Sequence, residues 1–389
     1  MPDRNSIRLV DVARAAGVHP STVSRVLHDS DRAAVRPETR ERIMAAAREL
    51  RYRPNALARG LKTAATATFG MLVPSLRNPV YADIVRGAVA EAARRGYVIL
   101  LAEDDSTVTE QAWDRLVEEG RIDGIIVASA APGNPILQLV AGSRVPYVFV
   151  NRRVPGSGRN VYMRETDAGQ LAAQHLIELG HVALGQIAGP LGLDTASRRA
   201  AGFADAVVSA GLALPVLVEA PFEERGAFEA MSRLLTSRVR PTGVYVSNLN
   251  QAIGALACAH RSGVRVPDDL SIVAYDDDPL AEFLEVPLTA IKMPLGELGR
   301  SAINALAAQI DGEPPRDLEV TTAPELVVRA STAPPRQAAV WADGSPTASV
   351  ARDALPGSPP PGSPPPGSAP PGSTPLASPA AAGPRGGGG

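Results

Sequence analysis

The residues best suited to binding chemistry in this sequence are Arg199 and Asp276. Arg199 stands in a TASRR segment that follows the apolar run ALGQIAG, and Asp276 comes directly after SIVAY. A planar guanidinium and a carboxylate each form paired hydrogen bonds, so together they can hold adjacent hydroxyl groups of a ligand. An ion pair, either local or between two lobes, is the structural alternative for both residues.

Seven further residues follow apolar runs in the same way. They are Asn78, Val80 and Tyr81 after TFGMLV, Asn151 and Arg152 after YVFV, Phe222 after VLVEA, and Asn248 after GVYVS. Ligands of open parallel sheets bind at the carboxyl ends of the strands, so we predict that these residues and the first two line one cleft. Tyr81 and Phe222 would supply an apolar face, unless they are ordinary core aromatics.

Motifs of the common enzyme classes are missing from the sequence. It contains no GxxxxGK(S/T), HExxH or GxSxG, and the glycine-rich stretch at 185–192 lacks GxGxxG spacing. The five histidines (19, 28, 175, 181 and 260) are scattered, and Cys258 is the only cysteine, which excludes a disulfide framework and a thiolate metal site. We expect a binding protein that is not an enzyme and has no catalytic residue, metal or cofactor.

The elements that would position the cleft residues alternate between strands and helices from Ala67 onward. The predicted strands read TFGMLV, VILLA, GIIVAS, YVFVN, ALGQIAG, VLVEA, GVYVS and SIVAYD. The predicted helices span 81–95, 170–179, 199–210, 227–235 and 251–261, and late elements at 295–310 and 325–329 cross back between lobes. Repeated β-α-β units imply parallel sheets with helices on both faces. The region is too long for one such sheet, so we predict two α/β lobes.

The first 62 residues differ from the rest in charge. They hold 13 Lys and Arg against 7 Asp and Glu, a balance of +6, while the remainder of the chain carries −8. Apolar spacing predicts helices at 9–16, 20–28 and 37–50, the first two joined by Gly17 and a tight turn. Two short helices joined in this way form a helix-turn-helix pattern, and a basic surface suits a polyanion. A solvated basic surface is the alternative.

The stretch 54–62, PNALARGLK, joins the two regions. Its alanines and leucines have helical spacing, but an isolated helix in water needs about 12–15 residues. We predict a hinge helix at 54–64 that couples a head at 1–53 to a two-lobed domain at 65–333.

The last segment, 334–389, is rich in Pro, Gly and Ser, with a five-residue repeat of PGSPP type. It cannot bury a core, so we predict a disordered tail. The start of the chain lacks the apolar segment of a secretory signal, and no apolar run reaches the ~18–20 residues of a membrane span, so we expect a cytoplasmic protein.

Motifs across residues 7–332 resemble the LacI/GalR family of bacterial transcription regulators. The head carries LVDVARAAGVHPSTVSRVLHD and VRPETRERIMAAARELRYRPNALARGLK, and the remainder carries NPVYADIVRGA, LGH, TASRRAAGF, RPTGVYVSN and VPDDLSIVAYDD. The resemblance implies a three-helix helix-turn-helix head and a two-lobed, periplasmic-binding-protein-like sensor. It implies a homodimeric repressor of pseudo-palindromic operator DNA, controlled by a sugar or sugar derivative.

Three alternatives to an inducible repressor remain open. One is an activator, another is a repressor that needs a corepressor and binds a non-sugar ligand, and the third is a cytoplasmic solute-binding protein with a degenerate head. The family commonly has Asn-Asp where this chain has Asn248-Leu249, so the class of ligand does not carry over, and a nucleobase also fits.

By resemblance, the second head helix reads base edges in the major groove. Pro20 and Ser21 occupy its two leading base-reading positions and Arg25 the third, where arginine can pair with guanine in bidentate fashion. Thr22 and Ser24 would contact phosphates, which position the head without specifying sequence.

The family begins its three head helices with Ser or Thr caps, but this chain has Arg8, His19 and Arg36 there. We interpret His19 and Arg36 as residues that exchange cap stability for phosphate contact; drift in an arginine-rich sequence is the alternative.

In the hinge, the resemblance implies DNA contacts from Asn55, Ala58, Leu61 and Lys62. Leu61 would be the apolar wedge in the minor groove, and Gly60 would weaken the helix in the absence of DNA.

Overall fold

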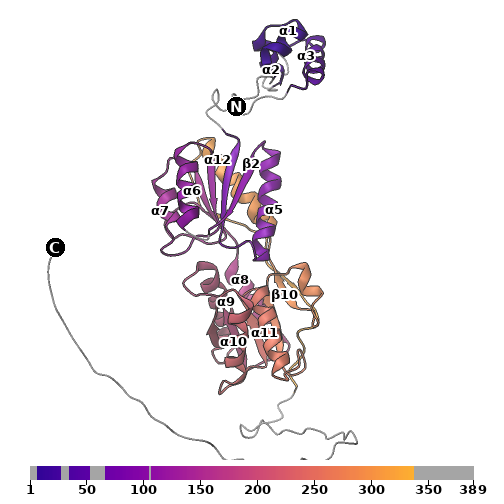
Figure 1. The fold of residues 1–389 in the computed structure, drawn as a ribbon. Helices are drawn as coiled ribbons and strands as arrows, with labels where there is room; N and C mark the ends of the chain where they lie inside the picture. Colours follow the sequence, from indigo (N-terminus) through magenta and orange to yellow (C-terminus); the bar gives the residue numbers. More distant parts are fainter. Residues whose placement is uncertain (1–6, 28–34, 53–65, 105–106, 337–389) are drawn as a thin grey trace, which may run out of the picture. The chain divides into compact units, whose positions relative to one another are not determined.

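The computed structural model describes residues 7–27, 35–52, 66–104 and 107–336. Among these residues the chain forms a helical head and two α/β lobes (Figure 1). The hinge at 54–64, with Asn55, Ala58, Leu61 and Lys62, lies outside the described residues, as does the chain from 337 onward. The domain boundaries therefore stay predictions.

The head consists of helices α1 (Leu9–Ala16), α2 (Pro20–Leu27) and α3 (Pro37–Glu49). Val12, Val23 and Ile43, one from each helix, are fully buried at its centre. Helix α1 ends at Gly17, whose φ of 63° lies in the left-handed region that glycine adopts without steric cost. The predicted apolar faces of the three helices are thus the faces that pack.

The first lobe contains a six-stranded sheet in the order β11-β5-β4-β3-β1-β2, with every neighbouring pair parallel. Its strands are β1 (Thr68–Val73), β2 (Val98–Glu103), β3 (Gly124–Val127), β4 (Tyr147–Val150), β5 (Asn160–Tyr162) and β11 (Leu318–Glu319). Its helices are α5 (Pro79–Arg94), α6 (Thr107–Glu118), α7 (Ile136–Gly142) and α12 (Leu295–Ile310).

The second lobe repeats this topology in the order β12-β10-β9-β8-β6-β7. Its strands are β6 (Leu184–Ala188), β7 (Val216–Glu219), β8 (Gly243–Val246), β9 (Ser271–Tyr275), β10 (Thr289–Lys292) and β12 (Glu325–Val327). Its helices are α8 (Glu165–Glu178), α9 (Asp194–Ser209), α10 (Glu224–Leu235), α11 (Leu249–Arg261) and the short 3₁₀ helix η1 (Pro279–Glu282). Only the pairing of β10 with β12 is antiparallel in this sheet.

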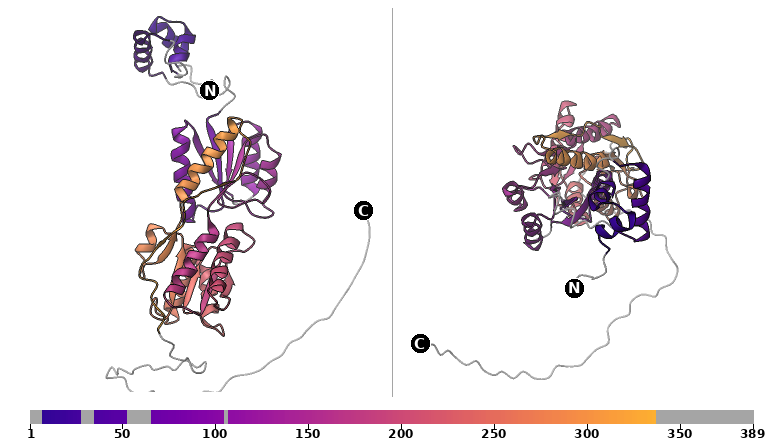
Figure 2. Two further views of the ribbon diagram at one scale, coloured as in Figure 1. Left: turned by 180° about the vertical axis from the view of Figure 1, so that it is seen from behind. Right: turned by 90° about the horizontal axis from the view of Figure 1, so that it is seen from above.

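The chain crosses between the lobes three times: after β5, after β10 and after β11. As a result, α8 packs beside α9 in the second lobe, and the late helix α12 packs beside α5 in the first (Figure 2). The two-lobed parallel α/β fold predicted from the sequence is confirmed, including the crossing of the late elements.

Glycines bring these two helix pairs close together. A Cβ on Gly87 of α5 would lie 2.1 Å from the Gly296 carbonyl oxygen of α12, and a Cβ on Gly202 of α9 would lie 2.1 Å from the Thr166 oxygen of α8. Because the overlapping atom is a backbone oxygen in both cases, no side-chain movement could remove the overlap. Only glycine fits at these two contacts.

Several short elements escaped prediction. Strands β5 and β11 contain three and two residues, which is too little sequence for an alternation to stand out. Strand β10 reads TAIK and lacks the continuous apolar run that marked the predicted strands. Helices α8 and α9 begin at Glu165 and Asp194, five residues before their predicted starts, because polar residues fill the first turn at the cleft. Within the described part of the chain, no helix is both long enough and apolar enough to cross a membrane.

Candidate functional site

All nine residues predicted for the cleft line one cavity. The sequence prediction missed one lining residue, Thr195, a buried side chain in the first turn of α9. Its only signal was its place at the start of the TASRR segment. Both lobes contribute to this site, which we call the effector cavity.

The first lobe supplies its residues from two strand ends. After β1, Asn78 caps α5, and its Oδ1 accepts a hydrogen bond from the Val80 amide at 3.2 Å. This cap places Val80 and Tyr81, which are buried, in the first turn of the helix at the cavity. After β4, Asn151 and Arg152 follow directly and are also buried.

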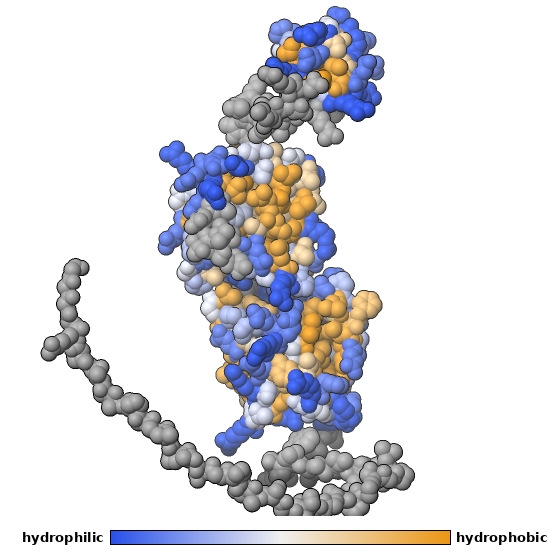
Figure 3. All heavy atoms as spheres, viewed as in Figure 1, coloured by the Kyte–Doolittle hydropathy of each residue, from blue (hydrophilic) through white to orange (hydrophobic). Residues whose placement is uncertain are grey.

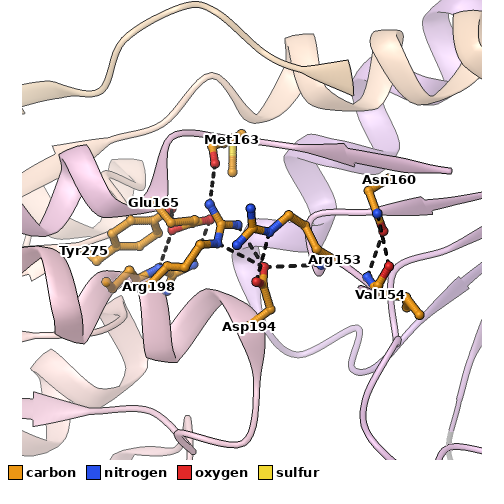
Figure 4. A network of polar contacts seen from close by, with 9 residues as sticks. Arg153, Val154, Asn160, Met163, Glu165, Asp194, Arg198 and Tyr275 are labelled. Atoms are coloured by element: carbon orange, nitrogen blue, oxygen red, sulfur yellow. Dashed lines mark hydrogen bonds and ion pairs between the residues drawn. The ribbon is translucent and has the colours of Figure 1, made fainter. Parts of the chain in front are cut away.

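The second lobe holds Arg199 in a network of buried contacts. Its Nε donates to Glu165 Oε2 at 2.6 Å, and its Nη1 donates to the Ser247 carbonyl oxygen at 2.8 Å. The guanidinium lies 3.5 Å from the ring centroid of Tyr275, whose hydroxyl donates to Glu165 (Figure 4). Arg199 therefore lines the cavity and also forms the local ion pair considered as its alternative.

Burial alone would lower the pKa of Arg199, but the charge of Glu165 raises it well above the ordinary value. The guanidinium is consequently a permanent cation whose orientation is set by Glu165 and Ser247. Its contacts leave N–H groups available to a ligand, because arginine carries five.

Asp276 is 5% exposed, and its Oδ1 has no hydrogen-bond partner among the described residues. Burial raises the pKa of Asp276 to about 7, and the charges of Glu165 and Asp278 add to this rise while Arg199 opposes it. Near neutral pH the carboxyl group is therefore present in both forms, so it can donate or accept a hydrogen bond.

Asn151 and Asp276 share an unusual backbone conformation. Their φ angles are 72° and 75°, in the left-handed region that non-glycine residues rarely adopt. Each directly follows the fourth strand of its lobe, β4 or β9, so the two strained residues occupy equivalent places. Such strain, worth about 1–3 kcal/mol, concentrates at ligand sites.

Asn248 is the N-cap of α11. Its Oδ1 accepts a hydrogen bond from the Gln251 amide at 2.8 Å, and its Nδ2 lies 3.5 Å from the Phe222 carbonyl oxygen. The next residue, Leu249, is 1% exposed and packs in the core of the second lobe. A core side chain therefore directly follows Asn248 in this chain.

A second polar network, which the sequence did not indicate, joins the lobes beside the cavity. Arg153, which follows β4, donates from Nε to Asp194 Oδ1 at 3.0 Å, and Arg198 pairs with the same carboxylate at 2.9 Å (Figure 4). Both guanidinium groups also lie over the ring of Tyr162, at 5.0 and 5.5 Å from its centroid. Asp194 therefore ties a first-lobe loop to the start of α9.

In the head, the predicted base-reading residues lie in the first two turns of α2. Ser21 and Arg25 are exposed, and Pro20, Thr22 and Ser24 are half-buried. A helix whose N-terminal side chains reach solvent in this way is suited to contact base edges.

The expected loss of the helix cap at His19 is not observed, while its contact with phosphate stays a prediction. The His19 Nδ1 lies 3.3 Å from the Ser21 amide, which donates to it, and 2.8 Å from the Ser21 hydroxyl. The imidazole nitrogen thus replaces the usual hydroxyl oxygen as acceptor. The side chains of Arg8 and Arg36 form no cap, although Asp11 Oδ2 accepts a hydrogen bond from the Arg8 amide.

The sequence matches two family models. Residues 8–55 match the model of bacterial regulatory proteins of the lacI family, and residues 173–332 match that of a periplasmic binding protein-like domain. The first covers the head and the second covers much of the sensor.

Known proteins are similar over most of the chain. The ribose operon repressor of Escherichia coli (strain K12) is 35% identical over 329 residues, which are 82% of this chain and 98% of that protein. The structure of the lac repressor dimer bound to operator and the anti-inducer ONPF is similar at 28% identity and a TM-score of 0.72, covering 85% of this chain and all of the other. The complex of the transcriptional regulator CelR with cellobiose is similar at 30% identity and a TM-score of 0.65, covering 84% and 99%.

The helix-turn-helix head, the two-lobed sensor with its cavity and the similarity to these regulators agree with one another. The chain belongs to the LacI family, and it is a DNA-binding transcription regulator with a ligand-binding domain.

Proposed function

We propose that this protein is a repressor whose affinity for operator DNA is controlled by a sugar or sugar derivative bound in the effector cavity. The observation that carries the proposal is the polar lining of that cavity. Asn78, Asn151, Arg152, Arg199, Asn248 and Asp276 surround it, and Tyr81 and Phe222 add apolar faces. Convergent amide, guanidinium and carboxylate groups beside aromatic rings suit a ring with several hydroxyl groups. The similarity to a cellobiose complex supports the same class of ligand.

Control of DNA binding follows from the division of the cavity between two lobes. A ligand that contacts both lobes stabilises the arrangement in which its hydrogen bonds are best satisfied. A ligand shifts such an equilibrium only by its difference in affinity for the two arrangements, and about 1–3 kcal/mol is typical of allosteric coupling. The ion pair between Arg153 and Asp194 lies at the same boundary and contributes to the balance.

We also propose a homodimer in which the first lobe forms part of the interface. The edge strand β2 exposes Val98, Leu100 and Leu101, and the neighbouring α5 exposes Val89. Figure 3 shows apolar side chains gathered over this part of the lobe. A second exposed apolar site lies at Leu280 and Phe283 in the second lobe. Contiguous apolar surface of this kind marks interaction sites, and a dimer presents two heads to a pseudo-palindromic operator.

The test is binding of the full-length protein to its own upstream intergenic DNA, measured by fluorescence anisotropy at several salt concentrations with and without a panel of sugars. An inducible repressor binds this DNA specifically and releases it when one sugar is added. Binding that appears only after a sugar is added indicates corepression instead. No specific binding at any salt concentration contradicts the proposal and favours the solute-binding alternative.

The head and hinge residues are further parts of this proposal. His19, Pro20, Ser21, Thr22, Ser24, Arg25 and Arg36 are proposed as DNA contacts from the head, and Asn55, Ala58, Leu61 and Lys62 from the hinge. Leu61→Ala should remove most specific affinity while salt-sensitive non-specific binding remains. Gly60→Ala should tighten DNA binding and blunt release by the effector, because it favours the helix by ~1 kcal/mol. We further propose that the protein is cytoplasmic and binds its ligand without transforming it.

A further inference from the structure

The four arginines around the effector cavity differ in their partners. Arg199 is paired with Glu165, and Arg153 and Arg198 are both paired with Asp194. Arg152 lines the cavity, yet no carboxylate among the described residues forms an ion pair with it. It is therefore the one arginine of this group whose charge is left uncompensated within the described protein.

Arg152 is also buried. Its exposed fraction is 9%, and its Nε has no hydrogen-bond partner among the described residues. Removing a charge from water is costly unless the group is paired and hydrogen-bonded, so buried charges are normally compensated. A buried, unpaired guanidinium at a ligand cavity is thus a group whose partner has to come from the ligand.

Two other polar atoms at the cavity lack partners in the described structure. They are Oδ1 of Asn151 and Oδ1 of Asp276, and both belong to buried side chains. Both are acceptors, although Asp276 can also donate because burial raises its pKa to about 7. Hydroxyl groups suit these two oxygens, whereas Arg152 is a donor and needs an acceptor, preferably a charged one.

The charge balance of the cavity points the same way. Arg152 and Arg199 are its cations, Glu165 already neutralises Arg199, and Asp276 is the only carboxylate in the lining. Leu249, which directly follows Asn248, is buried in the core and adds no carboxylate to the lining. Since Asp276 is partly protonated at neutral pH, the cavity carries an excess of positive charge.

We propose that the effector is an anionic sugar derivative, whose carboxylate or phosphate group pairs with Arg152 while its hydroxyl groups bind Asn151 and Asp276. This inference rests on the proposed function and narrows its class of ligand.

The first experiment uses inorganic phosphate as the probe. Thermal unfolding of the full-length protein is followed in phosphate and in chloride at equal ionic strength. The wild-type protein should melt at a higher temperature in phosphate. Arg152→Gln should lose most of this gain, while the control Arg153→Gln should keep it because Arg153 is already paired with Asp194. An equal gain in all three proteins would be a general salt effect and would overturn the proposal.

The second experiment compares matched sugars by isothermal titration: an aldose, its aldonate and its terminal phosphate, for the common pentoses and hexoses. At least one anionic member should bind more tightly than its neutral parent, and the aldonate and phosphate arms show which anion is preferred. Arg152→Gln should weaken that member about 10- to 100-fold, the range expected for a hydrogen bond to a charged group, and should weaken the neutral parent much less. Arg152→Lys keeps the charge and should retain part of the preference.

Tight binding of neutral sugars alone would overturn this inference and leave the proposed function intact. Binding of no member of the panel would also overturn it. Failure of specific operator binding, measured separately, would instead count against the proposed function.

Discussion

The two lobes repeat one scaffold. Both sheets have the same strand order, and in both the first helix packs against a helix that follows a crossover. Gly87 and Gly202 are each the ninth residue of the first helix, and Gly299 and Gly169 are each the fifth residue of its partner. Every one of these glycines faces a backbone carbonyl that a Cβ would overlap. The close helix contact is therefore a shared requirement of both lobes.

The lobes differ in what they present to the cavity. The second lobe holds Arg199 in advance through Glu165, Ser247 and Tyr275. The first lobe presents Asn151 and Arg152 with polar atoms that have no partner among the described residues. The second lobe thus carries a preorganised cation in helix α9, and the first lobe carries a cation without a described partner after β4. The fold determines where the binding groups lie. The neighbouring side chains determine whether those groups already have a hydrogen-bond or ion-pair partner in the protein.

The largest expected effect on stability comes from removing the partner of Arg199 in the second lobe. Glu165→Ala leaves the buried Arg199 without its partner, and breaking a buried ion pair costs about 3–5 kcal/mol. Urea unfolding should show a loss of this size. The control is Asp83→Ala in the first lobe, which removes a more exposed pair with Arg86 and should cost at most about 1 kcal/mol. Similar losses from both variants would contradict the difference drawn between the lobes.

Substitution of the glycines at the helix contacts tests whether these contacts are equivalent in the two lobes. Gly87→Ala and Gly202→Ala should each destabilise the protein by about 1–3 kcal/mol or more, because the new methyl group meets backbone. The controls are Gly142→Ala and Gly192→Ala, one in each lobe, where nothing lies within 4 Å of the added Cβ. If one lobe tolerates its substitution in urea unfolding and the other does not, the helix contacts are not equivalent.

We expect the stability of the protein to depend on pH through Asp276, which lies in the second lobe. Its pKa rises from 3.8 to about 7 on folding, so the native state keeps a proton that the unfolded chain has released. Stability should therefore fall as pH rises from about 4 to 7, by up to about 1.4 kcal/mol per pH unit from this group. Asp276→Asn should flatten that slope in unfolding curves between pH 5 and 7, and an unchanged slope would show that the carboxyl group is not buried as described.

The smallest expected effect concerns the boundary between the lobes. The ion pair of Arg153 with Asp194 is partly exposed, with 35% of the arginine side chain accessible, so Arg153→Ala should cost only about 0.5 kcal/mol of stability. Its effect should be seen instead in the ratio of operator affinities with and without effector. A change in stability without any change in that ratio would make the contact a simple surface pair.

Much of the cavity lining could be predicted because it depends on which residues directly follow the buried strands in the sequence. A residue that follows a buried strand of a parallel sheet lies at the edge where ligands bind, and this reasoning placed nine residues around one cavity. Thr195 was missed because α9 begins five residues before its apolar spacing becomes visible. The cap formed by His19 was missed because a nitrogen acceptor does not belong to the usual set of cap residues.

The sequence alone determined the alternation of strands and helices, the basic head, the residues at the strand ends and the family resemblance, since each depends on composition, spacing or motif. The tertiary structure decided which charges meet. Arg199 pairs with Glu165, 34 residues earlier in the chain, while Arg152 pairs with no described carboxylate although Arg153 beside it does. Burial and partnership depend on how crossovers fold segments distant in sequence onto each other, and no local pattern encodes them.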